Sequence, residues 1–437
     1  MRFFIDCTQT YFDGGTTGIP HVTRAIANAC AQAGQETGFE CYPVARISDR
    51  VFKITVIKDK NDLISLLRKK RLALRKKLKT LMPSSKDRIM KSKNEFVVTP
   101  APSIIKTLIA GLKKYQRNLK KHILTIFGMK IEFQAGDVFL LLEPNCDQSL
   151  LDVVDKAKLN GAKVGFVLYD LIPLKRPEWL DASFVAEFKD CFQKMLEIAD
   201  FCLAISESSR KELESYLSEE TRLVSQKSLK IGAFSLGVMR NKQKYSKIRS
   251  SLKDVFSTAS KPKPYLCVST LEPRKNQSLL LDVFEELWSR DIHARLCLVG
   301  GVWWRADALL NRILHHPQWQ KNLFMFNDLS DDEIVFCYQN AKALISASLA
   351  EGFGLPVVEG LSLGLPVFAS DIPSHREIGQ DYCAFFDPKA REPLFKLLEN
   401  FELSGRFPST QPTSGFSWPD WLQSAKELID QMRICAS

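Results

Sequence analysis

Two carboxylates flank a glycine-rich turn in the segment Glu351-Gly-Phe-Gly-Leu-Pro-Val-Val-Glu359. Glu351 follows an apolar run that is typical of a strand, and ligands of open α/β sheets bind at the carboxyl ends of strands. Glu359 is expected about one turn into the next helix, where its carboxylate can accept hydrogen bonds from sugar hydroxyls. The bland alternative is a glycine turn with two surface glutamates.

The same turn has the features of an anion site. Pro356 stands at the expected start of a helix, a position that tolerates proline because its missing N–H has no helical partner. The backbone amides of Gly354 and Leu355 would then point outward at a helix N-terminus. This arrangement suits an anion such as a nucleotide diphosphate.

Two adjacent cations follow an earlier strand, in the string Val268-Ser-Thr-Leu-Glu-Pro-Arg-Lys-Asn276. At the carboxyl end of that strand, Arg274 and Lys275 can clamp a leaving diphosphate. Charge-assisted hydrogen bonds of this kind strengthen as negative charge develops, so they also stabilise the transition state. An exposed basic turn that caps a helix is the alternative.

Short apolar runs alternate with helical patterns from about residue 262 to 390. This order favours a parallel sheet covered by helices on both faces, which is a doubly wound α/β domain. The expected strands are 265–270, 295–299, 323–326, 343–347, 366–369 and 384–386. Helices are expected at 277–288, near 306–314, from 331 and from 356.

The first half shows a similar but less regular pattern. Its expected strands are 2–6, 138–142, 163–168 and 202–205. A Lys/Ser/Arg-rich stretch from about 236 to 264 is typical of an interdomain linker. We therefore predict two Rossmann-like domains, 1–240 and 262–412, followed by a last helix within 416–437.

The net charge of +11 is concentrated in one segment. Residues 68–130 contain 19 Lys or Arg and two acids, a net charge of +17, so the remainder carries 11 − 17 = −6. A helical pattern in this segment has one apolar and one basic face, as follows. The apolar face carries Ile105, Leu108, Ile109, Leu112, Leu119 and Ile123. The basic face carries Lys106, Lys113, Lys114, Arg117, Lys120 and Lys121.

Two interpretations of that helix stay open. It can lie on an anionic membrane surface, or its apolar face can pack on a sheet while its lysines are solvated. Nucleic acid is not expected, because no aromatic stacking platform accompanies the charge. No apolar run is long enough for a membrane span, no secretory signal pattern is present, and the eleven irregularly spaced cysteines suit reduced thiols. A cytoplasmic protein, at most peripheral on the inner membrane, is expected.

The motifs together resemble glycosyltransferase family four, whose members have the GT-B fold of two facing Rossmann-like domains. The resemblance rests on the segment 346–360, its continuation 364–378 and the Glu-Pro-Arg-Lys-Asn string, and it is patchy before residue 240. It implies that Glu359 binds the nucleotide ribose, that Glu351 lies against the donor sugar, and that the loop after 326 holds the base. The donor-binding residues it implies are Gly18, Ser269, Arg274, Lys275, Asn327, Leu329, Glu351, Gly352, Phe353, Gly354, Leu355 and Glu359.

The resemblance also places residues of the first half beside the acceptor. Gly14 and Gly15 match the family's glycine-rich loop, which is not the fingerprint of a dinucleotide site. Many members have His-Asp at the strand end where this sequence has Tyr169 and Asp170. Asp170 is therefore the expected catalytic-side residue there, together with Glu351, Arg274 and Lys275. A buried Asp that accepts turn amides is the alternative. Ser206 matches the family's next strand-to-helix turn or is only an N-cap.

The implied activity is retaining sugar transfer from a nucleotide sugar to a glycan or polyprenyl-linked acceptor. No cofactor and no metal are expected, because the two cations and the helix amides take the metal's place. The Glu-Pro-Arg-Lys-Asn and Tyr-Asp-Leu-Ile-Pro strings resemble bacterial O-antigen and capsule mannosyltransferases, so GDP-mannose is the preferred donor over UDP- or dTDP-sugars. Other glycan-assembly proteins are further expected partners. The alternatives are a GT-B nucleotide-sugar epimerase and an inactive sugar-binding module.

Overall fold

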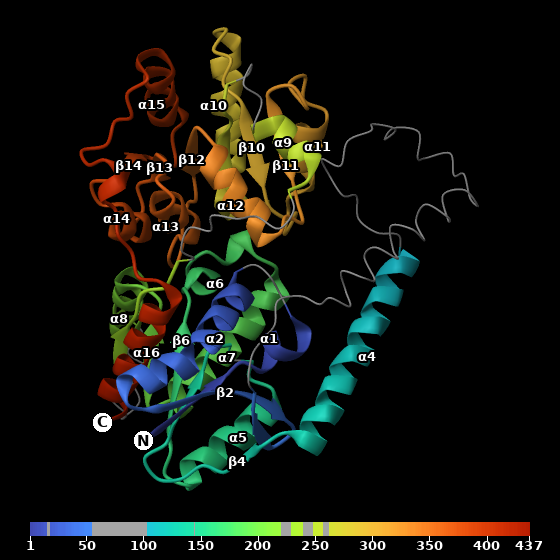
Figure 1. The fold of residues 1–437 in the computed structure, drawn as a ribbon, viewed down its shortest axis with the longest axis vertical. Coiled ribbons are helices and arrows are strands. Elements are labelled where there is room, and N and C mark those ends of the chain that lie inside the picture. The colour runs from blue at the N-terminus through green and yellow to red at the C-terminus, as the bar shows by residue number, and fades with distance from the viewer. Residues whose placement is uncertain (15–17, 55–102, 144, 220–228, 239–247, 257–261) are drawn as a thin grey trace. The chain divides into compact units, whose positions relative to one another are not determined.

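The computed structural model describes residues 1–437 except 15–17, 55–102, 144, 220–228, 239–247 and 257–261 (Figure 1). The described residues form two compact units, 1–163 and 164–437. The predicted boundary at residue 240 lies inside the second unit, and the domain assignment stays a prediction.

The first unit is built on parallel strands with a hairpin at one edge. Its elements are β1 (Arg2–Asp6), α1 (Thr8–Asp13), α2 (Ile19–Thr37), β2 (Glu40–Ile47), β3 (Arg50–Lys53), α4 (Ser103–Phe127), β4 (Lys130–Ile131), β5 (Val138–Leu141) and α5 (Gln148–Leu159). The strand order is β4-β3-β2-β1-β5. Strand β1 is parallel to both of its neighbours, whereas β3 is antiparallel to β2 and β4. The two-residue connection after β2, with Ser48 at φ 53°, produces this hairpin.

The second unit begins with three parallel strands in the order β6-β7-β8. Its first elements are β6 (Lys163–Leu168), α6 (Ile172–Lys175), the 3₁₀ helix η2 (Pro177–Trp179), α7 (Ala182–Ile198), β7 (Phe201–Ala204), α8 (Glu207–Glu219), β8 (Lys230–Ala233) and α9 (Ser250–Phe256). Helix α9 lies within the stretch predicted as a linker. Its side chains Leu252, Val255 and Phe256 are buried, which explains why this part is ordered.

A six-stranded parallel sheet with the order β11-β10-β9-β12-β13-β14 forms the rest of the unit. Its elements are β9 (Tyr265–Val268), η3 (Pro273–Lys275), α10 (Gln277–Ser289), β10 (Leu296–Val299), α11 (Asp307–Leu314), β11 (Leu323–Phe326), α12 (Asp331–Asn340), β12 (Ala343–Ser346), α13 (Leu355–Ser362), β13 (Val367–Ser370), α14 (Pro373–Gly379), β14 (Cys383–Phe386), α15 (Arg391–Ser404), η4 (Thr413–Gly415) and α16 (Trp421–Ala436). The predicted doubly wound fold is confirmed here. Helix α16 packs on β7 and β8.

The two faces of this sheet carry different helices. Alternate strand residues such as Tyr265, Leu296 and Ala343 form one core with side chains of α10, α11 and α15. On the other face, α13 packs on β12 and β13, where Leu344 and Val367 lie against Gly360. Each loop at the carboxyl edge of this sheet therefore leads to a helix on one face of the sheet or on the other.

The cysteines follow the expectation only in part. Nine of them are free and buried: Cys7, Cys30, Cys41, Cys202, Cys267, Cys297, Cys337, Cys383 and Cys435. Cys146 and Cys191 are disulfide-bonded, so the expectation of reduced thiols is wrong for these two. Among the helices of the described residues, none is long and apolar enough to span a membrane.

Candidate functional site

The turn between β12 and α13 has the conformation that its glycines allow. Gly354 precedes the helix at φ 124°, which side chains with a Cβ rarely adopt. Gly352 has no room for a Cβ, because one would lie 2.0 Å from the Tyr169 carbonyl oxygen. Helix α13 begins at Leu355, with Pro356 as its second residue, one position from the prediction. The sequence therefore fixes both the turn and the helix start.

The loop after β9 brings the two cations to this turn. Arg274 and Lys275 lie in η3, and Asn276 ends it in the left-handed region at φ 58°. The Leu349 backbone N–H donates to the Arg274 carbonyl oxygen at 2.8 Å, which ties the two loops together. Strands β9 and β12 are parallel neighbours, so both loops leave the same edge of the sheet.

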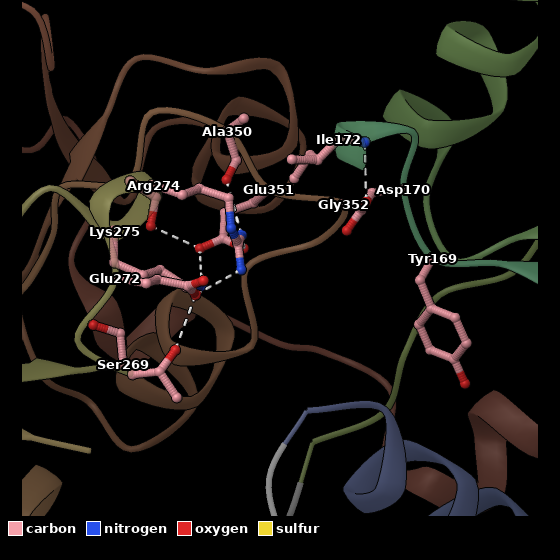
Figure 2. Close-up of polar contacts among 12 residues, drawn as sticks. Tyr169, Asp170, Ile172, Ser269, Glu272, Arg274, Lys275, Ala350, Glu351 and Gly352 are labelled. Atoms are coloured by element: carbon pink, nitrogen blue, oxygen red, sulfur yellow. Dashed lines mark hydrogen bonds and ion pairs between the residues drawn. The ribbon is translucent and has the colours of Figure 1, made fainter. Parts of the chain in front are cut away.

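Glu351 is the centre of an ion-pair cluster (Figure 2). Its Oε2 accepts a hydrogen bond from the Arg274 guanidinium at 2.8 Å, and its Oε1 pairs with the Lys275 ammonium. Ser348 Oγ donates to Oε1 at 2.7 Å. The guanidinium also pairs with Glu272 at 3.0 Å and donates to the Ala350 carbonyl oxygen at 3.1 Å. Two cations thus meet two carboxylates, a local balance of formal charge.

Burial strengthens the electrostatic interactions among these charges. It would by itself raise the pKa of Glu351, but the charges of Lys275 and Arg274 hold that pKa well below its usual range. Burial would likewise lower the pKa of Arg274, whereas the Glu351 and Glu272 carboxylates raise it. Glu351 is therefore an anion and Arg274 a cation throughout the neutral range.

A pocket opens beside the cluster. Its polar lining includes Ser269, Lys275, Ser348 and Glu351, and Pro356 of α13 borders it. Ser269 Oγ accepts a hydrogen bond from the Gln277 amide at 2.8 Å. The pocket has room for about one water molecule, so its serine hydroxyls, ammonium and carboxylate surround one small polar site.

Asp170 and Tyr169, which follow β6, flank the glycine turn. Burial raises the pKa of Asp170, and the nearby Arg274 charge opposes this rise. One Asp170 oxygen accepts a hydrogen bond from the Ile172 backbone N–H at 3.0 Å. This contact agrees with the alternative interpretation of Asp170 as a buried residue that accepts turn amides. The Tyr169 ring points away from the ion-pair cluster (Figure 2).

Ser206, which precedes α8, and Ser209, in the first turn of α8, hold the same glycine turn. The hydroxyls of Ser206 and Ser209 donate to the Gly352 carbonyl oxygen at 2.6 and 3.0 Å. Ser206 also accepts from the Ser209 backbone N–H at 3.0 Å, so it is an N-cap as well. Glu377 of α14 accepts the Glu207 and Ser208 amides at 2.9 and 2.8 Å.

Glu359 lies on α13 and is only half-buried. It accepts a hydrogen bond from the Tyr338 hydroxyl of α12 at 2.8 Å. Burial raises the pKa of Glu359 to about 7, and the Tyr338 hydrogen bond acts against this rise. The carboxyl therefore changes its charge near neutral pH.

The remaining predicted residues lie in three other places. Asn327 and Leu329 follow β11, next to a capping box formed by Ser330 and Glu333 at the start of α12. Phe353 is buried, with its ring 5.9 Å from that of Trp418. In the first unit, Gly14 ends α1 and Gly18 precedes α2, both with positive φ. Gly15 is outside the described residues, as are residues 68–102 of the basic segment.

Several polar residues at the site were not singled out from the sequence. They are Glu272, Ser348, Tyr338 and His375. His375 is fully buried with its Nδ1 3.0 Å from Ser370 Oγ, and burial lowers its pKa to about 4, so the imidazole is neutral at pH 7. The proximity of Glu272 to Arg274 and of Ser348 to Glu351 in sequence was a usable signal. In the described part of the chain, no group of three or more His, Cys, Asp or Glu side chains is arranged to hold a metal ion.

Comparison with known proteins identifies the region that carries this site. Residues 249–408 match the family model described as glycosyl transferases group 1. These residues form a group 1 glycosyltransferase domain. The domain contains the complete Arg274, Lys275 and Glu351 cluster, together with Glu359.

Relatives extend the similarity beyond this glycosyltransferase domain. The serotype-specific mannosyltransferase WbdA of Escherichia coli is 31% identical over 285 residues, which cover 65% of this chain and 35% of WbdA. The chain thus spans about a third of the length of that curated relative. The O-antigen chain mannosyltransferase B of Escherichia coli is 31% identical over 126 residues, which cover 28% of this chain and 32% of that protein. The predicted resemblance to O-antigen mannosyltransferases is confirmed.

Solved structures show the fold. HepE of Anabaena, solved in complex with UDP, has a TM-score of 0.52 at 14% identity, over 100% of this chain and 94% of HepE. Sucrose-phosphate synthase of Thermosynechococcus elongatus has a TM-score of 0.53 at 13% identity, over 100% and 95%. The fold is GT-B, as predicted.

Proposed function

We propose that this protein is a retaining mannosyltransferase that moves mannose from GDP-mannose to an O-antigen or lipid-linked glycan. The observation that carries the proposal is the convergence of Arg274 and Lys275 on Glu351 beside the pocket. Similarity to a mannosyltransferase supports the choice of sugar. The names of the relatives favour transfer over the epimerase and the inactive module.

In this proposal the diphosphate of the donor binds the two cations. The bond between the mannose C1 and the β-phosphate oxygen breaks, and its electron pair stays on the diphosphate. Arg274 and Lys275 stabilise that developing charge, as fixed cations in a water-poor site do. They supply the charge that a metal provides elsewhere, so no metal and no cofactor are part of the proposal.

The acceptor hydroxyl attacks C1 from the face that the diphosphate leaves, which retains the anomeric configuration. Its proton passes to an oxygen of the departing phosphate, so no protein nucleophile takes part. Glu351 accepts hydrogen bonds from the donor sugar and Glu359 from the ribose. Because Glu351 already orders both cations without a ligand, the diphosphate meets preorganised donors.

A screen of nucleotides by thermal unfolding tests the choice of donor. We expect GDP and GDP-mannose to raise Tm, whereas UDP and dTDP leave it nearly unchanged at the same concentration. A ligand at about 100 times its Kd stabilises the folded state by about 2.7 kcal/mol. If only UDP or dTDP raises Tm, that nucleotide replaces GDP in the proposal. If none of these nucleotides raises Tm, the proposed function is wrong.

The proposed location is the cytoplasmic face of an anionic membrane, with α4 as the contact. In the part of α4 whose side chains are described, Leu119 and Ile123 are 47% and 50% exposed, so they are not packed on a sheet. The cationic side instead contacts α1. Lys120 Nζ donates to the Tyr11 carbonyl oxygen at 2.8 Å, and Arg117 lies 3.3 Å from Asp13. An exposed apolar stripe in a basic segment suits an anionic lipid surface.

Vesicle sedimentation tests this contact. We expect binding to phosphatidylglycerol-containing vesicles, weaker binding at high salt, and little binding to phosphatidylcholine vesicles. Leu119→Asn with Ile123→Asn should weaken the binding several-fold, whereas Leu159→Asn, at an exposed residue of α5, should not. Equal sedimentation with both vesicle types and at both salt concentrations would remove the membrane contact.

A further inference from the structure

A fully buried histidine packs against the glycine turn. His375, in α14, is 0% exposed, and none of the roles proposed above uses it. A Cβ at Gly354 would lie 2.9 Å from His375 Cδ2, so the ring meets the turn where the backbone has its positive φ. Buried polar atoms are almost always hydrogen-bonded, so the partners of the two ring nitrogens indicate what this side chain does.

The hydrogen bonds of the ring assign its tautomer. Nδ1 lies 3.1 Å from the Ser370 carbonyl oxygen, which can only accept, so Nδ1 carries the hydrogen. Ser370 Oγ, 3.0 Å from the same nitrogen, gives its own proton to the Ser348 carbonyl oxygen and therefore also accepts from Nδ1. Nε2 of the neutral ring is then an acceptor, and the Ser346 hydroxyl lies 3.4 Å from it.

A continuous chain of hydrogen bonds joins this ring to the ion-pair cluster. Ser370 Oγ donates to the Ser348 carbonyl oxygen at 2.6 Å. Ser348 Oγ in turn donates at 2.7 Å to Glu351 Oε1, the oxygen that also pairs with Lys275. The two serines and His375 are at most 3% exposed, so water does not compete for these bonds. Hydrogen bonds in such a buried chain strengthen one another.

The serine contact gives the Glu351 carboxylate a direction that the cations alone do not give. The Lys275 ammonium is a compact charge with rotatable donors, so it attracts the carboxylate without fixing its angle. The Arg274 guanidinium shares its donors with two other oxygens. The Ser348 hydroxyl, by contrast, belongs to a residue whose carbonyl is held by Ser370. The angle of the carboxylate therefore depends on this chain.

We infer that His375 is a positioning residue, which sets the angle of the Glu351 carboxylate through the two buried serines. The chain itself is independent of the activity, whereas the contact of Glu351 with the donor sugar rests on the proposed function. Side chains that touch a ligand need such a supporting layer of hydrogen bonds to stay in the productive geometry. Loss of the chain is therefore expected to weaken binding of the sugar more than binding of the diphosphate.

Two substitutions of His375 test the inference. Asn can place its amide N–H near the position of Nδ1, whereas the longer Gln places its amide near that of Nε2. In His375→Gln, the Kd of GDP-mannose is expected to rise about tenfold more than the Kd of GDP, which is the effect of one lost hydrogen bond to a charged group. His375→Asn should keep the ratio of the two Kd values close to that of the wild type. Titration calorimetry measures both values.

The ratio of the two Kd values separates positioning from a purely structural role. A variant that is only less stable has a lower Tm and binds both ligands less tightly by the same factor. Ser370→Ala should raise the ratio as His375→Gln does, and the double variant should raise it no further, because both changes break the same chain. His316→Gln removes a ring that lies 3.0 Å from Glu285 in the same domain, and this control should leave the ratio unchanged.

The outcomes distinguish this inference from the proposed function. An unchanged ratio in His375→Gln overturns the positioning role, whatever the Tm of the variant, and so does an equal rise in His375→Asn. If the wild-type protein binds neither GDP nor GDP-mannose, the proposed function fails, and the 13C carboxyl NMR signal of Glu351, assigned with Glu351→Gln, tests the inference. A signal that moves in His375→Gln and stays in His375→Asn supports the positioning role, and a signal that moves in neither variant overturns it.

Discussion

Arg274→Gln together with Lys275→Gln is expected to weaken GDP binding by about 10²–10⁴-fold, because each lost charge-assisted hydrogen bond contributes about 1.5–3 kcal/mol. Both cations contact the buried Glu351 carboxylate, and Lys275 and Glu351 line the pocket. Titration calorimetry with GDP measures the effect. Arg312→Gln removes a cation that pairs with Asp282 and Glu285 in the same domain, and this control should leave the Kd unchanged.

Loss of folding must be separated from loss of binding in this variant. Removal of both cations leaves Glu351 buried without a charged partner, which is expected to destabilise the protein by about 3–5 kcal/mol. Adding Glu351→Gln removes that uncompensated charge, so the triple variant should unfold at a higher temperature than the double variant. Glu272 keeps the Thr270 hydroxyl as a donor at 2.9 Å in both.

Donor binding is expected to depend on pH through Glu359. The pKa of this carboxyl is raised to about 7 in the free protein, and only the ionised form accepts hydrogen bonds at both oxygens. Affinity for GDP-mannose should therefore be near its maximum at pH 8, about half of it at pH 7, and about tenfold lower at pH 6, as the ionised fraction decreases. GDP-mannose is the suitable probe, because its diphosphate lacks the second ionisation near pH 6 of a terminal phosphate.

Two variants check this assignment. Glu359→Gln should bind GDP-mannose about tenfold more weakly at pH 8 and show no pH dependence between 6 and 8. Tyr338→Phe removes the hydrogen bond that opposes the raised pKa, so the midpoint should move to higher pH. A wild-type affinity that is constant from pH 6 to 8 would contradict a ribose contact by Glu359.

The sequence predicted the glycosyltransferase domain well because its strands are short, continuous apolar runs between helices. All six predicted strands there occur, with shifts of one or two residues at their ends. The hairpin β2–β3 was not predicted, since β3 has no such apolar run. Helix α9 was hidden in a Lys/Ser-rich stretch, although Leu252, Val255 and Phe256 have helical spacing.

Some contacts of the site could be predicted from the sequence and others could not. Neighbouring strands of a parallel sheet end at the same edge. The approach of Arg274, after one such strand, to Glu351, after the next, could therefore be expected. The bond from Tyr338 to Glu359 joins two helices that follow strands on opposite sides of β9, and no local pattern indicates it. The contact of Ser206 with Gly352 spans 146 residues and depends on tertiary packing alone.

The grip of two cations on a diphosphate is tested most directly by titrating GDP into the Arg274→Gln/Lys275→Gln/Glu351→Gln protein. This variant removes the clamp together with the Glu351 carboxylate that both cations contact. We predict a folded protein that retains no measurable affinity at GDP concentrations that saturate the wild type. A folded triple variant that binds GDP as tightly as the wild type would contradict the account.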